Sequence, residues 1–190
     1  MKPAPIPAAL TSLDAMERAG MTDAAQHEAL ERVAAEFRIR MSGAMSEVAA
    51  DGVRAQFVPD VRELQVLPEE RADPIGDDEH APVPGLTHRY PDRAILHATK
   101  ACEVYCRFCF RRETVGEAGR LPEAEFDGVL DYLRATPSLR EVIFTGGDPL
   151  VLSARRLGGM LARLEAVGTL ETGRFPSRVP VGAPGKGTGG

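Results

Sequence analysis

The first 55 residues carry the spacing of amphipathic helices. In the stretch DAAQHEALERVAAEFRIR, apolar side chains recur every four positions, at Ala25, Ala29, Val33 and Phe37. This period predicts a helix with one buried face. Ser12, Thr22 and Ser42 precede three such segments, and their hydroxyl groups are suited to cap the first N–H groups of each helix. We therefore expect residues 1–55 to form an α-helical N-terminal region.

Residues 56–93 have a different character, because they are rich in proline and acidic residues and show little periodicity. Composition alone predicts a linker here. A structureless connection longer than about 15 residues is unusual inside a compact domain, however. The stretch also contains apolar residues that can dock on a core, so we expect an ordered meander.

Beyond residue 93 the pattern alternates between strands and helices. Ala94–Ala98 and Glu141–Thr145 read as buried strands, and helical patterns follow Pro122 and Ser153. This order is typical of βαβ units in a parallel sheet or barrel, so the predicted fold class is α/β. In such folds, the loops that leave the carboxyl ends of the strands carry the functional residues.

The composition excludes several classes of protein. With 190 residues, 43% hydrophobic and 27% charged, the chain resembles globular proteins and is long enough for a core. A formal net charge of −5 lacks the basic excess typical of nucleic-acid-binding domains. No apolar run approaches the roughly 20 residues of a membrane span. The N-terminus lacks the apolar core of a signal peptide, which predicts a cytoplasmic protein.

The three cysteines, Cys102, Cys106 and Cys109, fall within eight residues. An odd number of cysteines in one loop argues against a secreted disulfide framework. The spacing offers three thiolates to one inorganic centre, one ligand fewer than a closed zinc or iron–sulfur site takes. An open coordination position is typical of a catalytic metal site.

This spacing, with Phe108 between the second and third cysteines, resembles the loop of the radical S-adenosylmethionine (SAM) enzymes. More narrowly, residues 57–180 resemble the lysine 2,3-aminomutase family in five segments, which occur in the family's order: DPIGDDEH, PGLTHRYPDR, CEVYCRFCFRRETVG, VIFTGGDPLVLS and SRVP. The resemblance implies an incomplete radical SAM (β/α) partial barrel over residues 94–181, preceded by the helical region and the meander.

The resemblance also implies an isomerase that moves the amino group of L-lysine from the α to the β carbon. Its cofactors are a [4Fe–4S] cluster, SAM and pyridoxal phosphate (PLP). By resemblance, the reduced cluster passes an electron to SAM, and the resulting radical takes a hydrogen from lysine. The protein orients these groups and excludes water, since the difficult chemistry belongs to the cofactors.

The resemblance assigns roles to ten residues and a catalytic role to none. The cluster ligands are Cys102, Cys106 and Cys109. Arg111 matches the arginine that binds the substrate carboxylate, a task suited to a bidentate guanidinium. The residues that face SAM are Gly146, Gly147 and Asp148, because glycine permits close approach of the backbone and a carboxylate suits an ammonium group. The residues near the PLP phosphate are Arg89, Tyr90 and Arg93.

The residues by themselves leave alternatives open. With His97 as a fourth ligand, the cysteines also fit a zinc or redox thiol site. Gly-Gly-Asp-Pro is also the composition of a plain strand-to-helix turn. Arg111 and Arg112 are consistent with a solvated surface pair, and Arg89 and Arg93 with ion pairs to the acidic residues of DDEH.

The length of the chain predicts an incomplete barrel. Only 81 residues follow Cys109, and a βα unit takes about 30 residues, so fewer than three further units fit. Residues 182–190 read as a Gly-rich tail without a helix signal. Lys186 in this tail is not followed by Ser or Thr, as a P-loop requires, and it lies too early to match the family's PLP lysine. We therefore expect a truncated family member or one piece of a split protein.

Four functional readings follow. The first is an aminomutase that acts on free lysine, in a form lacking the PLP lysine. The second is a family variant that makes β-lysine for elongation factor P. The third is a non-catalytic iron–sulfur-binding remnant, and the fourth a zinc or redox thiol protein. The expected partners are the small molecule lysine and either a second copy of the chain or a complementing fragment, with no nucleic acid and no membrane.

Overall fold

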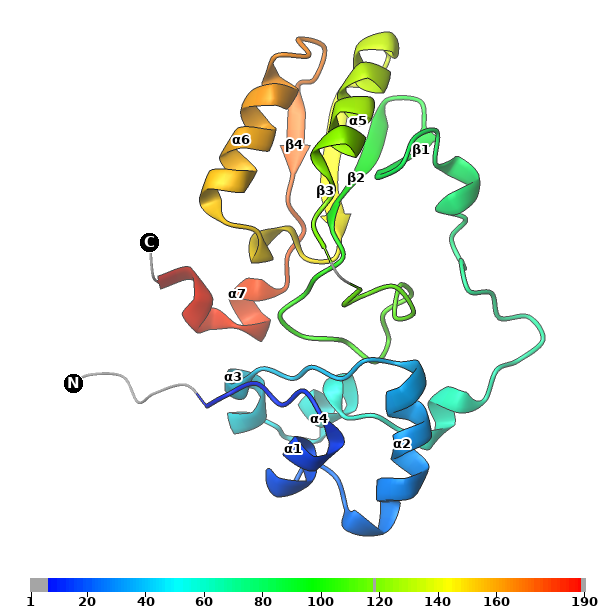
Figure 1. The fold of residues 1–190 in the computed structure, drawn as a ribbon, viewed down its shortest axis with the longest axis vertical. Helices are drawn as coiled ribbons and strands as arrows, with labels where there is room; N and C mark the ends of the chain where they lie inside the picture. The colour runs from blue at the N-terminus through cyan, green and yellow to red at the C-terminus, as the bar shows by residue number, and fades with distance from the viewer. Residues whose placement is uncertain (1–6, 118, 189–190) are drawn as a thin grey trace. The chain divides into compact units, whose positions relative to one another are not determined.

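The computed structural model describes residues 7–117 and 119–188, and the chain forms two compact units (Figure 1). Within the described residues, the first unit consists of residues 7–74, 102–115 and 178–188. The second unit consists of residues 75–101, 116–117 and 119–177. Each unit has its own hydrophobic core. The domain boundaries expected from composition stay predictions.

The first unit is built from short helices. Its α-helices are α1 (Leu13–Arg18), α2 (His27–Glu36), α3 (Gly43–Glu47), α4 (Asp51–Phe57) and α7 (Val179–Gly182). Its 3-10 helices are η1 (Ala24–Gln26), η2 (Val61–Leu64) and η5 (Pro184–Thr188). The apolar faces meet in a core that includes Met16, Leu30, Val33, Phe37 and Phe57. Of the four positions in the predicted period, Val33 and Phe37 are buried, 0% and 2% exposed, whereas Ala29 is partly buried and Ala25 is exposed.

Two of the three predicted N-caps in this unit are confirmed. Ser12 and Ser42 each accept a hydrogen bond of 3.2 Å from the backbone N–H three residues later. The prediction for Thr22 is wrong, because η1 begins one residue later and Asp23 accepts the N–H of Ala25 at 2.9 Å. A short acidic side chain caps as well as a hydroxyl, so local spacing did not separate the two positions.

The second unit contains a four-stranded mixed sheet in the order β1-β2-β3-β4. Its strands are β1 (Leu86–Tyr90), β2 (Arg93–Thr99), β3 (Glu141–Gly146) and β4 (Thr172–Arg174). Strand β1 is antiparallel to β2, whereas β2, β3 and β4 run parallel. Its helices are α5 (Glu123–Ala135) and α6 (Ala154–Glu165), with η3 (Asp78–His80) and η4 (Pro149–Val151) in the connections.

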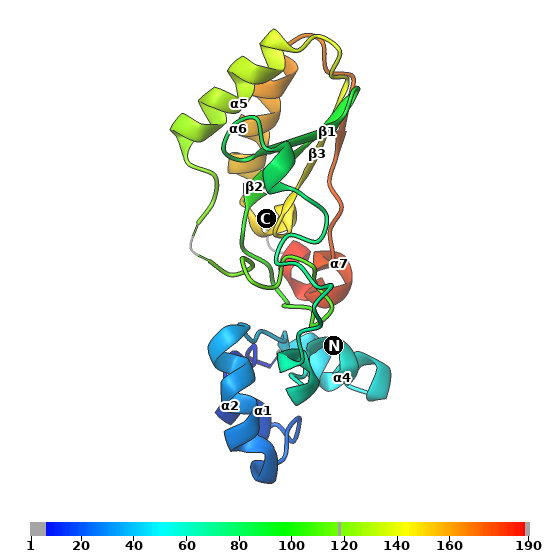
Figure 2. The same cartoon turned by 90° about the vertical axis from the view of Figure 1, so that its right-hand side faces the viewer.

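Helices α5 and α6 lie side by side on one face of this sheet (Figures 1 and 2). The strand residues that join them in the core alternate along each strand: Ala94, Leu96, Ala98, Val142 and Phe144. The intervening Ile95 and Ile143 are only partly buried. One face of the sheet therefore carries the core, and the carboxyl ends of β2 and β3 lie at the same edge.

The structure confirms the α/β class and the predicted strand–helix–strand–helix order, while a barrel stays a prediction. Strand β1 lies in the predicted meander, where a proline on each side obscured its pattern. The expectation that the tail has no helix is wrong, because the 3-10 helix η5 forms there, with a backbone bond from Lys186 N–H to Ala183 O at 3.0 Å. Residues 189 and 190 lie outside the described residues. No described helix is long and apolar enough to cross a membrane.

Candidate functional site

The cysteine loop, residues 102–115, is held to the first unit by its backbone. The N–H of Tyr105 donates to the carbonyl of Arg40 at 2.8 Å, and that of Arg107 donates to the carbonyl of Gln56 at 2.8 Å. Between the second and third cysteines, the Cys109 N–H donates to the Cys106 carbonyl at 3.0 Å and closes a turn. The loop therefore has a defined path although it contains no helix or strand.

An ion pair fixes the centre of this loop. The Arg107 guanidinium donates to both carboxylate oxygens of Glu63, at 3.0 and 2.6 Å, and to the carbonyl of Arg38 at 2.9 Å. The two charged side chains are only 8% and 10% exposed. A two-point pair of this kind sets the orientation of both groups, because both have planar ends.

The three cysteines are free thiols, and each is partly buried. Arg178 donates a hydrogen bond of 2.9 Å to the Sγ of Cys106, and its other terminal nitrogen donates to Gln56 at 2.7 Å. Burial raises the pKa of the Cys106 thiol, and the Arg178 charge opposes that change by favouring the thiolate. Metals bind thiolates, so Arg178 acts in the direction that ligation requires.

The two arginines after Cys109 are not a simple solvated pair. The guanidinium of Arg111 lies 4.4 Å from the ring centre of Phe110, and that of Arg112 lies 4.1 Å from the ring centre of Phe37. Both arginines are partly buried. Stacking on a ring leaves the edge of a guanidinium able to donate hydrogen bonds, so Arg111 keeps the chemistry that binding a carboxylate needs.

The donor set of the loop fits an iron–sulfur cluster, because three reduced, partly buried thiols lie within one loop. Among the described residues, no three His, Cys, Asp or Glu side chains come close enough to hold a metal ion. The fit therefore rests on the chemistry of the donors. His97, the alternative fourth ligand, lies in the second unit and shares a hydrogen bond of 2.8 Å with Thr87 Oγ1.

In the second unit, the Gly-Gly-Asp-Pro motif follows the end of β3. Gly146 has a φ of +99°, and a Cβ there would lie 2.6 Å from the carbonyl oxygen of Thr99. A Cβ on Gly147 would collide with the carbonyl oxygen of Ala101. Both glycines are thus required by the close approach of the chain that leaves β2, whatever else they contact.

Asp148 is 7% exposed and has structural partners of its own. Its Oδ1 accepts the N–H of Leu150 at 3.0 Å and the hydroxyl of Ser177 at 2.8 Å, and its N–H donates to the Ala101 carbonyl at 2.9 Å. The turn reading of this motif is therefore confirmed in geometry, because Asp148 caps η4. A contact of these residues with SAM stays a prediction.

Arg89, Tyr90 and Arg93 lie at the other end of the same sheet. Arg93 opens β2 and pairs with Asp92 at 3.3 Å and with Glu141 at 3.7 Å, rather than with the DDEH acids. Strand β3 separates this end from Gly146 by roughly 17 Å, at about 3.3 Å per residue. The predicted PLP and SAM residues are therefore not brought together within the second unit.

Arg89 has different neighbours from Arg93. Its guanidinium lies beside the backbone of Gly76 and near Glu79, on the loop that carries the DDEH residues. Tyr90 is 58% exposed, and the Arg93 guanidinium lies 5.8 Å from its ring centre. This end of the sheet therefore presents two cations and one aromatic ring.

Local sequence patterns did not identify Arg178, the side chain that donates a hydrogen bond to Cys106. Arg178 follows Cys106 by 72 residues, and the Glu63 that holds the loop precedes Arg107 by 44 residues. The resemblance includes the SRVP segment that contains Arg178. It does not predict that Arg178 lies beside a cysteine thiol. Such contacts depend on how distant segments pack, which no local spacing encodes.

Several curated proteins are similar to most of this chain, although no family model matches it. An L-lysine 2,3-aminomutase from Clostridium subterminale is 42% identical over 135 residues, which are 70% of this chain and 32% of that protein. The Bacillus subtilis L-lysine 2,3-aminomutase is 40% identical over 133 residues, 70% of this chain and 28% of its own length.

A more distant match agrees with these two. The L-lysine 2,3-aminomutase of Escherichia coli is 35% identical over 136 residues, 72% of this chain and 40% of its own. The chain thus spans about a third of the length of the curated relatives that it matches. Over the part that it shares with these proteins, the chain is similar to L-lysine 2,3-aminomutases at 35–42% identity.

Proposed function

We propose that this chain carries the cluster-binding part of a radical SAM aminomutase that converts L-lysine to β-lysine. The observation that carries the proposal is the set of three free cysteines in one hydrogen-bonded loop, in a chain related to the L-lysine 2,3-aminomutases. The substrate, the cofactors and the activity belong to the proposal, because the chain spans only part of those proteins. A cytoplasmic location stays a prediction.

In this proposal Cys102, Cys106 and Cys109 hold a [4Fe–4S] cluster, which when bound supplies an electron for the reductive cleavage of SAM. The hydrogen bond from Arg178 to Cys106 favours the thiolate, and hydrogen bonds to cluster sulfurs also tune reduction potentials. Arg111, held against Phe110, binds and orients the carboxylate of lysine.

The remaining cofactor contacts lie on the sheet. Asp148 and the two glycines before it bind SAM, the carboxylate facing its ammonium group, and Arg89, Tyr90 and Arg93 bind the phosphate of PLP. Cations at the amino end of β2 suit a phosphate. The PLP lysine is not assigned to any residue of this chain.

Anaerobic reconstitution of the 190-residue chain with iron and sulfide tests the proposal. We expect about four irons per chain and an EPR spectrum of the reduced protein that changes when SAM is added. Replacing Cys102, Cys106 or Cys109 with Ala should abolish the cluster. Thr114→Ala in the same loop is the matched control and should retain it, because its hydroxyl only contacts the carbonyl of Arg111.

The other readings predict different outcomes. Tight zinc binding without iron supports the zinc or redox thiol protein and rejects the proposal. A cluster whose EPR spectrum does not change when SAM is added supports the non-catalytic remnant. With SAM, PLP and a reductant, β-lysine formed from free lysine supports the aminomutase. Conversion of lysine to β-lysine that requires elongation factor P supports the family variant.

A further inference from the structure

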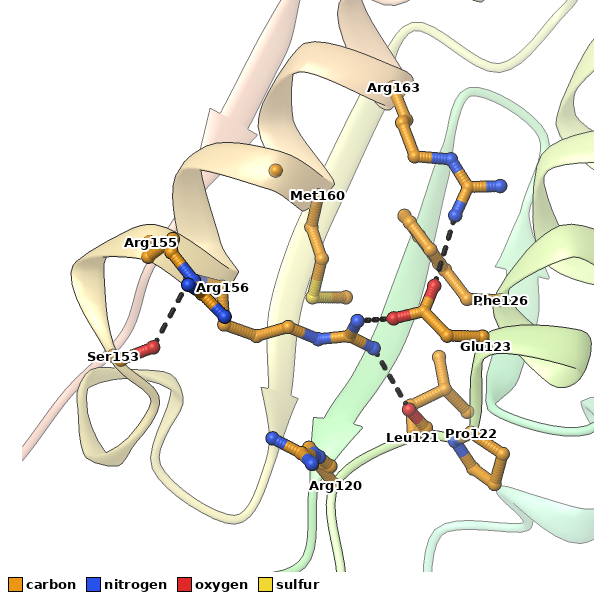
Figure 3. Close-up of a pocket in the computed structure, with 11 residues that line it drawn as sticks. Arg120, Leu121, Pro122, Glu123, Phe126, Ser153, Arg155, Arg156, Met160 and Arg163 are labelled. Carbon is orange, nitrogen blue, oxygen red and sulfur yellow. Dashed lines mark hydrogen bonds and ion pairs between the residues drawn. The ribbon is translucent and has the colours of Figure 1, made fainter.

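A hollow of about 620 Å³ lies in the second unit between the first turn of α5 and most of the length of α6, from its N-cap Ser153 to Arg163 (Figure 3). Four arginines line it: Arg120, Arg155, Arg156 and Arg163. Glu123 is the one acidic residue of the lining. Arginine is the side chain best suited to bind phosphate groups, because its fork of donors matches phosphate oxygens.

The charges of this pocket are not balanced by the protein. Glu123 pairs with Arg156 and, at 3.2 Å, with Arg163, which also pairs with Asp127 outside the lining. Within the described part of the chain, Arg120 and Arg155 have no ion pair. Burial lowers the pKa of Arg156, and the charges of Arg120 and Arg163 lower it further. The pocket therefore holds more positive charge than its carboxylates neutralise.

One buried donor of the pocket wall lacks an acceptor, and one helix start at the wall lacks a side-chain cap. Arg156 reaches from α6 to the Leu121 carbonyl at 3.0 Å, yet its Nε is buried and has no hydrogen-bond partner among the described residues. Helix α5 begins after Pro122 without a side-chain cap. Its first N–H groups and the positive end of its dipole favour an anion at this point.

We propose that this pocket binds a small molecule that carries a diphosphate group. The volume exceeds that of a single phosphate and suits a compact ligand. In the free protein Glu123 is the internal counter-ion of the two arginines that it contacts, and the ligand competes with it for them. The proposal concerns the face between α5 and α6 and does not depend on the aminomutase activity.

Isothermal titration of the full chain with pyrophosphate at low ionic strength tests the proposal. We expect saturable binding with one site per chain, weakened about tenfold by Arg155→Gln and also by Arg120→Gln, since each removes one charge-assisted contact. Both side chains are exposed, so the variants should fold, and circular dichroism checks this. Arg134→Gln on α5 lies outside the lining and should bind like the wild type.

Glu123→Gln provides the opposite prediction. Removing the internal counter-ion should tighten pyrophosphate binding several-fold, because Arg156 then loses its paired carboxylate and Arg163 keeps Asp127 alone of its two. Absence of saturable binding to the folded wild type overturns the proposal. So does equal loss of affinity in Arg134→Gln and Arg155→Gln, which indicates diffuse attraction. Weaker binding by Glu123→Gln contradicts the role given to that residue.

Discussion

At the scale of single residues, the pair of Arg107 and Glu63 determines the path of the cysteine loop. Both side chains are nearly buried, and Arg107 stands between Cys106 and Cys109 in the sequence. A buried ion pair adds little net stability by itself, but loss of Glu63 leaves the Arg107 charge without its carboxylate, and loss of Arg107 leaves Glu63 with the more distant Arg112, at 3.8 Å. The loop is therefore sensitive to either substitution.

We expect Glu63→Gln to lower the free energy of unfolding of the first unit by about 3 kcal/mol, the usual cost of breaking a buried pair. Urea unfolding followed by circular dichroism measures this change. Arg62→Gln is the matched control: Arg62 pairs with Asp60 at 2.7 Å but is 79% exposed. It should cost less than about 1 kcal/mol. Equal effects of the two variants would show that the buried pair has no special weight.

The residue scale also shows what local patterns reveal about the site. Three cysteines within eight residues predict a metal-binding loop directly, because the ligands come from adjacent positions. The contact of Asp148 with Ser177 and that of Arg178 with Cys106 could not be predicted from neighbouring residues. Asp148 binds Ser177, and Arg178 binds Cys106, and both contacts join segments that are far apart along the chain.

At the scale of elements, glycines with different roles look alike in the sequence. Gly147 directly follows β3, at a point where a side chain has no space, since a Cβ would meet the Ala101 carbonyl. Gly158 lies inside α6, and a Cβ there would meet nothing within 4 Å. Glycine generally weakens a helix. Only the packing shows at which position a larger side chain would not fit.

Gly147→Ala and Gly158→Ala should therefore change stability in opposite directions. Gly147→Ala should destabilise the second unit by about 1 to 3 kcal/mol, the usual cost of forcing extra atoms into a filled space. Gly158→Ala should stabilise it by up to about 1 kcal/mol, because alanine favours a helix and restricts the unfolded chain. Thermal unfolding of both variants measures the two shifts. A loss of stability in Gly158→Ala would contradict the open space described for it.

At the scale of the whole molecule, the chain has two hydrophobic cores. Leu30 of α2 lies in one core and Leu133 of α5 in the other, 3% and 0% exposed. Compact units with separate cores generally open as separate cooperative units. The two leucines therefore offer a matched pair of substitutions.

Leu133→Ala should destabilise its unit by about 2 to 5 kcal/mol, as removal of a buried leucine side chain usually does. Hydrogen exchange measured by mass spectrometry should then accelerate in α5, β2 and β3 and stay unchanged in α2. Leu30→Ala should produce the reverse pattern. Acceleration throughout the chain in both variants would show that the two cores unfold as one.

Features that depend on neighbouring residues could be predicted from the order of residues alone. These are the α/β class, the buried positions Val33 and Phe37, the strands β2 and β3, two caps of N-terminal helices and the spacing of the thiols. Hydrophobic period, capping and ligand spacing are local properties, so the order of residues is sufficient to express them.

The residues that surround each local feature became known only from the tertiary structure. It showed that the core covers one face of the sheet, that β1 pairs with β2, and that Arg178 and Glu63 support the cysteine loop. It also gathered four arginines around one hollow, three from α6 and Arg120 from the loop before α5. These arrangements arise because burial of apolar surface brings distant segments together, and the polar groups that arrive with them must then find partners.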